Sequence, residues 1–125
     1  DAGMTEQGLR ELGAADLDLA ILENVGNLVC PAEFDTGAVK NVAILSVPEG
    51  HDKPLKYPLM FEVCQALIIN KIDVLPYFDF NMDKVREFAH KRNPDIEIFP
   101  ISAKTGEGVD AWCNWLEAQV RAWNE

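Results

Sequence analysis

The chain has 125 residues, a length typical of one domain or part of one. Its acidic residues outnumber its basic residues by 21 to 11, which gives a formal net charge of −10. Because nucleic acids and anionic membrane surfaces attract positive charge, this balance argues against a nucleic-acid or membrane-surface binder. No apolar run approaches the roughly 20 residues needed to cross a bilayer, and the first residues lack the pattern of a signal peptide. The three cysteines include no C-x-x-C pair, which favours a reducing, cytoplasmic setting.

Taken in chain order, apolar runs alternate with amphipathic segments. Residues 4–13 are predicted to form a helix, although Gly8 weakens that prediction. The apolar runs have apolar residues on both faces in their middles, as expected for parallel strands covered by helices. These predicted strands are residues 17–24, 41–47, 65–71 and 96–102.

Two later segments have helical periodicity. In residues 81–92, Val85, Phe88 and Ala89 share one face, and Asn81 is a suitable N-cap. Residues 109–123 repeat apolar side chains at the same spacing. The predicted fold is therefore α/β, an open and mostly parallel sheet with helices on both faces and right-handed crossovers.

Open α/β sheets place their sites beyond the carboxyl ends of the strands. Each predicted strand is followed by polar or turn residues at this end, namely residues 23–26, 46–50, 70–73 and 102–104. These four loops are therefore the candidate functional site.

The third and fourth of these loops contain groups that suit a guanine base. The Asp73 carboxylate can accept two parallel bonds from the ring N–H and the exocyclic amine of guanine, a donor pair that adenine lacks. Asn70 can brace the loop or reach the base N7, and the stem of Lys71 can lie across the purine ring. A backbone N–H of residues 102–104 can point at the guanine carbonyl oxygen.

Asn-Lys-x-Asp at residues 70–73, followed about thirty residues later by Ser-Ala-Lys, is the guanine-reading pair of GTPases. With the longer strings around it, this pair resembles the HypB family, GTPases that help insert nickel into nickel–iron hydrogenase. The resemblance covers nearly the whole chain from residue 16 onward. The strings are "ENVGNLVCPAEFD" (23–35), "EGHDKPLKYPLMF" (49–61), "NKIDVLPYFDF" (70–80) and "ISAKTGEGVDAWCNWLE" (101–117).

The resemblance implies a GTP-hydrolysing metallochaperone that uses GTP, Mg2+ and Ni2+ or Zn2+. The implied partners are a second copy of the chain, hydrogenase maturation proteins and the hydrogenase large subunit. It implies guanine-binding roles for Asn70, Lys71, Asp73, Ser102, Ala103 and Lys104.

The departures from the family pattern are also informative. Residues 1–125 contain no Gly-x-x-x-x-Gly-Lys-Ser/Thr, the loop that binds phosphates and places the magnesium ligand. In the family this loop precedes the region seen here, as does a metal-binding Cys-His pair. Residues 1–125 are therefore interpreted as the carboxy-terminal portion of a single GTPase domain, P-loop GTPase-like but incomplete. We expect the isolated chain not to hydrolyse GTP.

Three residues between 23 and 30 take roles from the resemblance. Glu23 is expected to hold magnesium directly or through water, the alternative being a capping acid. Gly26 is expected to let its loop approach the γ-phosphate, so Glu23 and Gly26 are the implied catalytic pair. Cys30 is expected to bind nickel or zinc together with the upstream Cys-His pair, although such a cysteine by itself is usually a small buried hydrophobe.

Apolar residues stand unusually close to the polar motifs. An exposed apolar patch usually marks a partner, and the family dimerises through this region. A satellite core beneath the next helix is the alternative. The residues are Tyr57, Val74, Leu75, Tyr77 and Phe78, with Val74 and Phe78 the expected central contacts.

The remaining candidates are open. We expect Lys53 and Lys56 to lie near the phosphates, across the dimer or in solvent. His51 is expected to be a solvated loop residue, the alternative being a role in nickel binding. Cys64 and Cys113 are predicted to be core positions. The alternative functions are a related accessory GTPase for urease or a cobalamin enzyme, and a non-catalytic dimerisation or metal-binding fragment.

Overall fold

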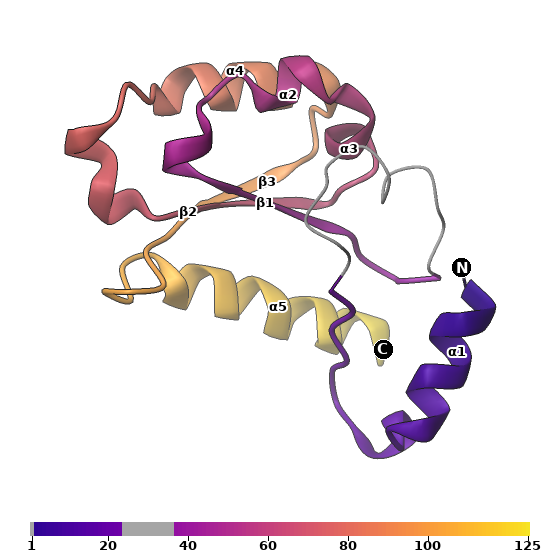
Figure 1. Ribbon diagram of the computed structural model, residues 1–125. Coiled ribbons are helices and arrows are strands. Elements are labelled where there is room, and N and C mark those ends of the chain that lie inside the picture. The colour runs from indigo at the N-terminus through magenta and orange to yellow at the C-terminus, as the bar shows by residue number, and fades with distance from the viewer. Residues whose placement is uncertain (1, 24–36) are drawn as a thin grey trace.

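The computed structural model describes residues 2–23 and 37–125. Helices are labelled α, short 3-10 helices η and strands β (Figure 1). In chain order the described elements are α1 (Ala2–Glu11), η1 (Ala14–Asp16), β1 (Val42–Ser46), η3 (Val47–Glu49), α2 (Lys53–Lys56), α3 (Pro58–Glu62), β2 (Ala66–Asn70), η4 (Ile72–Tyr77), α4 (Met82–Arg92), β3 (Glu97–Pro100) and α5 (Val109–Trp123).

The described strands form one parallel sheet in the order β1-β2-β3. Ser46 pairs with Asn70, and Ile69 pairs with Pro100, so the three carboxyl ends lie together at one edge, on the left in Figure 1. Three of the four predicted strands are confirmed, as are the helices at 81–92 and 109–123. The Asn81 side chain caps α4 by accepting from the Lys84 N–H at 3.0 Å, as predicted.

Helices cover both faces of the sheet, which confirms the predicted fold class. The short helices α2 and α3 lie with α4 over one face, and α5 lies over the other (Figure 1). Alternation along the strands sends Leu45, Leu67 and Ile69 into the core beneath α4, where Val85 and Ala89 meet them. On the other face, Phe99 of β3 packs against Trp112 and Trp115 of α5, with ring centroids 5.4 and 5.8 Å apart.

The predicted strand at 17–24 is wrong over residues 17–23, the part that the structure describes. These residues are irregular, and apolar side chains such as Leu17 and Ile21 are 53% and 78% exposed. An apolar run becomes a strand only where a neighbouring strand offers N–H and C=O partners. Among the described strands, none pairs with this segment, so Glu23 follows irregular backbone rather than the end of a buried strand.

The two described cysteines differ. Cys64 is 1% exposed and packs in the core as predicted; burial raises the pKa of its thiol to about 11. Cys113 is exposed, so the prediction of a core position was wrong. It follows Trp112 on α5, and one helical step of about 100° turns it away from the half-buried stripe that contains Trp112 and Leu116.

None of the described helices is long and apolar enough to cross a membrane.

Gly108 is predicted to be the least replaceable glycine among those described. It has φ +76°, and a Cβ would lie 2.2 Å from the Pro100 carbonyl oxygen. We expect Gly108→Ala to lower the free energy of unfolding by about 2–3 kcal/mol, since backbone strain and a steric clash add. Urea unfolding measures this loss of stability.

Gly106→Ala is the matched control. Gly106 also has a positive φ, +86°, but nothing lies within 4 Å of the position that a Cβ would take. It should lose only about 1 kcal/mol. Equal losses in the two variants would contradict the close approach to Pro100.

Candidate functional site

The loops after β2 and β3 are held side by side at the carboxyl edge of the sheet. The Ile101 N–H donates to the Ile69 carbonyl at 2.7 Å, and the Ile72 N–H donates to the Ile101 carbonyl at 3.2 Å. These two bonds extend the pairing past the strand ends. Residues 70–73 and 102–105 are therefore positioned by the sheet itself.

Asn70 braces both loops. Its Oδ1 accepts from the Lys71 N–H at 2.8 Å and from the Ala103 N–H at 3.1 Å. These bonds are the bracing interaction predicted for Asn70, and contact of Asn70 with the base N7 stays a prediction. The Ala103 N–H consequently points at Asn70 in this structure, and the Ser102 N–H donates to the Glu107 carbonyl at 2.9 Å.

Asp73 is oriented by a buried serine. The Ser102 hydroxyl donates to Asp73 Oδ1 at 2.8 Å and accepts from the Thr105 N–H at 3.1 Å. Ser102 is 0% exposed, so water cannot reach this hydroxyl and take the place of either hydrogen-bond partner. The other carboxylate oxygen, Oδ2, has no hydrogen-bond partner among the described residues and remains available to a ligand.

Backbone geometry completes the arrangement. Lys71 adopts the left-handed conformation, with φ 66° and ψ 36°, and this turn leads the chain from β2 into η4. The Gly106 N–H closes the second loop on the Ser102 carbonyl at 2.8 Å. Lys71, Ala103 and Lys104 are exposed. The structure thus brings together all six residues predicted from the two motifs.

Glu49 is a site neighbour to which the sequence reasoning gave no role. Its Oε2 accepts from both the backbone N–H and the hydroxyl of Ser46, at 2.7 and 2.9 Å. Ser46 pairs with Asn70 in the sheet, so this contact adjoins the site. A Ser-x-x-Glu spacing at a strand-to-helix junction is the signal that could have found it.

The predicted metal ligands are not assembled in the described residues. Glu23 is exposed, and Gly26 and Cys30 lie outside the residues that the structure describes. Within residues 2–23 and 37–125, no group of three or more His, Cys, Asp or Glu residues could hold a metal ion. Because a single exposed carboxylate is a poor site for either Mg2+ or Zn2+, the described donors alone do not fit a metal.

The apolar set beside the motifs divides in two. Tyr57, Val74 and Leu75 are half-buried and pack against the core. Tyr77 and Phe78 are 81% and 46% exposed. The satellite-core interpretation therefore fits the first three, and an unburied aromatic pair remains at the end of η4.

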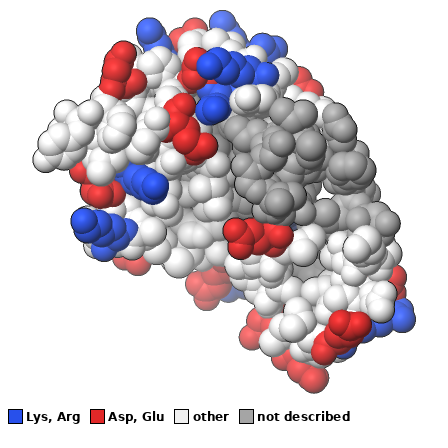
Figure 2. Space-filling model, viewed as in Figure 1, with Lys and Arg blue, Asp and Glu red and all other residues white. Residues whose placement is uncertain are grey.

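The lysines of α2 make local contacts. Lys56 Nζ lies 3.2 Å from Asp52 Oδ2, and this hydrogen bond lowers the pKa of the Asp52 carboxyl. Lys53 Nζ lies 5.4 Å from the centroid of the Tyr57 ring. On the face shown in Figure 2, acidic and basic groups are interspersed over the described residues.

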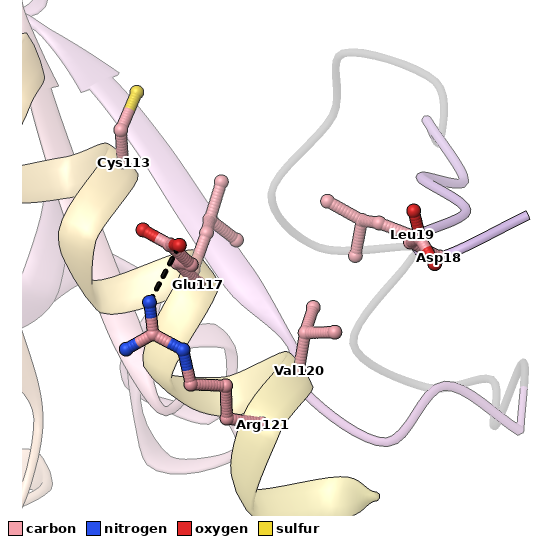
Figure 3. A pocket seen from close by; sticks show the side chains of 7 residues that line it. Asp18, Leu19, Cys113, Glu117, Val120 and Arg121 are labelled. Atoms are coloured by element: carbon pink, nitrogen blue, oxygen red, sulfur yellow. Dashed lines mark hydrogen bonds and ion pairs between the residues drawn. The ribbon is translucent and has the colours of Figure 1, made fainter.

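An open hollow of about 440 Å³ lies elsewhere, between α5 and the irregular segment before residue 24. In Figure 3, Cys113, Glu117, Val120 and Arg121 lie on α5, and Asp18 and Leu19 lie across from this helix on the irregular segment; the Arg121 side chain turns toward Glu117. Arg121 and Glu117 pair with each other at 2.6 Å. The hollow shares no residue with the loops at 70–73 and 102–105.

Comparison with known proteins identifies relatives. No protein-family model matches the chain. The chain is 51% identical over 119 residues to "Hydrogenase maturation factor HypB" of Escherichia coli K12, covering 95% of this chain and 41% of that protein. It is 44% identical over 114 residues to "Hydrogenase/urease maturation factor HypB" of Helicobacter pylori J99, covering 90% of this chain and 47% of that protein.

A solved structure agrees. The crystal structure of HypB from Helicobacter pylori in complex with nickel superposes with a TM-score of 0.89 at 42% identity, over 97% of this chain and 58% of that one. The resemblance to HypB is therefore confirmed. The chain spans less than half the length of the curated relatives it matches.

Ser102→Ala is expected to lower the free energy of unfolding by about 1–3 kcal/mol, because it leaves Asp73 and the Thr105 N–H without their buried partner. Thermal or urea unfolding measures the loss. Thr105→Ala is the control: its hydroxyl makes only an exposed contact with the Glu107 N–H, 3.2 Å away, so it should cost less than about 0.5 kcal/mol. A Ser102 variant as stable as the wild type would contradict the role of the Ser102 hydroxyl in holding Asp73 and the Thr105 N–H.

Proposed function

The chain is homologous to part of the HypB maturation factors, and from this premise we propose that it forms the base-reading, carboxy-terminal portion of a GTPase domain. One observation carries the proposal. The Ser102 hydroxyl holds the Asp73 carboxylate at the carboxyl edge of the sheet, with Oδ2 unused, and Asn70 joins the two loops that carry these residues. Sequence motif and geometry therefore point to the same ligand group, a purine with two adjacent N–H donors.

The proposed recognition follows from donor and acceptor chemistry. Ionised Asp73 accepts the ring N–H and the exocyclic amine of guanine, while the Ser102 hydroxyl keeps the carboxylate oriented. Adenine presents no such donor pair. If adenine occupied the site, Asp73 would lose its hydrogen bonds to water and gain none from the base. The alkyl stem of exposed Lys71 supplies one wall of the base site, and Lys104 extends from the neighbouring loop.

GTP hydrolysis, in this proposal, belongs to a longer protein that also supplies a phosphate-binding loop. Residues 1–125 contain no such motif. Glu23 would hold Mg2+, which neutralises phosphate charge when bound. Gly26 would allow its loop to approach the γ-phosphate.

Nickel handling is proposed for the same longer protein. Cys30 would bind Ni2+ or Zn2+ together with a Cys-His pair supplied from outside this sequence. The nickel complex of the Helicobacter pylori relative supports metal handling in this family. The cargo would pass to the hydrogenase large subunit, with other hydrogenase maturation proteins as partners.

A homodimer is proposed through the exposed Tyr77 and Phe78, with the remaining exposed surface of the half-buried Tyr57 and Val74 beside them. The exposure of Tyr77 and Phe78 supports it, since two neighbouring aromatic rings left in water usually mark a contact surface. The cytoplasmic setting stays a prediction.

Urease maturation is a second candidate function. The Helicobacter pylori relative is named for both hydrogenase and urease. A non-catalytic fragment remains the alternative for the chain by itself.

Asp73→Asn, in a protein that includes the phosphate-binding loop, should weaken GTP binding about tenfold to hundredfold, because an amide cannot accept both guanine donors. Xanthosine triphosphate should gain in relative affinity, because its extra carbonyl accepts from the new amide. Calorimetry with both nucleotides measures the change. Asp79→Asn, which removes an exposed charge nearby, is the control; unchanged GTP affinity in the Asp73 variant would remove Asp73 from the site.

Cys30→Ala in the longer protein should lower nickel and zinc affinity by more than about tenfold. Even the loss of a residue that only hydrogen-bonds to a metal ligand lowers metal affinity by about 10–100-fold. GTP hydrolysis should largely survive. Metal binding to the wild type should weaken as pH falls, since a thiolate ligand must lose its proton. Cys113→Ala, at an exposed position on α5, is the control; metal titrations of the Cys30 variant that overlay the wild type would make Cys30 a packing residue.

A further inference from the structure

His51 connects two loops that leave the carboxyl edge of the sheet. Its Nδ1 accepts a hydrogen bond of 3.1 Å from the backbone N–H of Asn81. His51 follows η3, the short helix after β1, whereas Asn81 is the N-cap of α4. A single side chain therefore joins the β1–α2 loop to the segment that runs from η4 to α4.

The contact has a second component. The His51 ring meets the Phe80 ring edge-on, with centroids 5.9 Å apart and an interplanar angle of 80°. His51 and Phe80 are both half-buried. Asn81 uses its side chain to cap α4 through the Lys84 N–H, so its own N–H remains for His51. The short helices η3 and η4 also lie against each other.

The hydrogen bond fixes the protonation state of the ring. A backbone N–H can only donate, so Nδ1 must be unprotonated and the ring proton must lie on Nε2. A second proton on Nδ1 would set two N–H groups against each other. We propose that His51 is a proton-sensitive latch, which holds residues 78–81 to the β1–α2 loop when neutral and releases them when protonated.

Charges of both signs surround the latch. Asp52 pairs with Lys56 at 3.2 Å, and the positive charge of a protonated His51 also contributes to lowering the pKa of the Asp52 carboxyl. The segments that meet at His51 carry the following ionisable residues: Glu49 in η3, Asp52, Lys53 and Lys56 in α2 and its N-cap, Asp73 and Tyr77 in η4, Asp79 before α4, and Asp83 and Lys84 in the first turn of α4.

Release has a local consequence. Residues 78–81 begin directly after the exposed Tyr77, so protonation frees the aromatic pair Tyr77 and Phe78 from one of its supports. The Asn70 and Ser102 bonds involve no histidine and stay formed. The latch involves this chain alone and does not rest on the proposed function.

Hydrogen exchange of the 15N-labelled 125-residue chain tests the latch. The His51 ring resonances report its protonation in the same samples. The protection factor of the Asn81 amide, corrected for intrinsic exchange, should fall about threefold to tenfold as His51 protonates, which is the net value of one hydrogen bond. The 15N shifts of the neutral ring should place the proton on Nε2.

His51→Asn is the matched variant, because its Oδ1 occupies the Nδ1 position and does not titrate. Its Asn81 protection should stay constant over the same pH range. His90 is an internal control, since its Nε2 donates to the Ile96 carbonyl at 3.1 Å and keeps that bond when protonated. Constant wild-type protection, a proton on Nδ1 of the neutral ring, or the same pH-dependent loss in His51→Asn would each overturn the proposal.

Discussion

The parallel pairing of β2 with β3 determines where the residues of the two candidate-site loops, 70–73 and 102–105, lie. Because parallel strands end at the same edge, Asn70 and the loop after Pro100 become neighbours although more than thirty residues separate them. The Ser102–Asp73 bond and the Asn70–Ala103 bond then connect the two loops across this edge. A change of register by one residue would separate the partners and turn the buried side chains of β2 to the other face.

Short-range patterns in the sequence were sufficient for much of this architecture. Continuous apolar runs predicted β1, β2 and β3, and Asn81 predicted the start of α4, because both signals act within a few residues. The motif at 70–73 also predicted which side chains gather at the site. The hydrogen-bond partners of individual groups were harder to predict from the sequence. The Ala103 N–H donates to Asn70, a contact that depends on the distance between the two loops and not on the sequence of either loop alone.

Residues 17–23 show why some predictions from the sequence were wrong. Their apolar composition is that of a strand, yet strand formation depends on a hydrogen-bonding neighbour that local pattern does not encode. Cys113 illustrates the same limit on a helix, where one residue of offset separates a packed tryptophan from an exposed thiol. His51 was expected in solvent, but a residue 30 positions away supplies its hydrogen bond.

The hydrogen bonds between loops 70–73 and 102–105 hold these loops in place without a ligand, so the proposed guanine site is preformed. A 15N chemical-shift titration of the 125-residue chain with guanosine monophosphate and, in parallel, adenosine monophosphate tests this directly. Preformed loops should give millimolar binding, worth about 4 kcal/mol, with guanosine-specific shifts confined to the amides of residues 70–73 and 102–104. Equal shifts with both nucleotides, or no shift in these two loops, would show that the chain has no preformed guanine site.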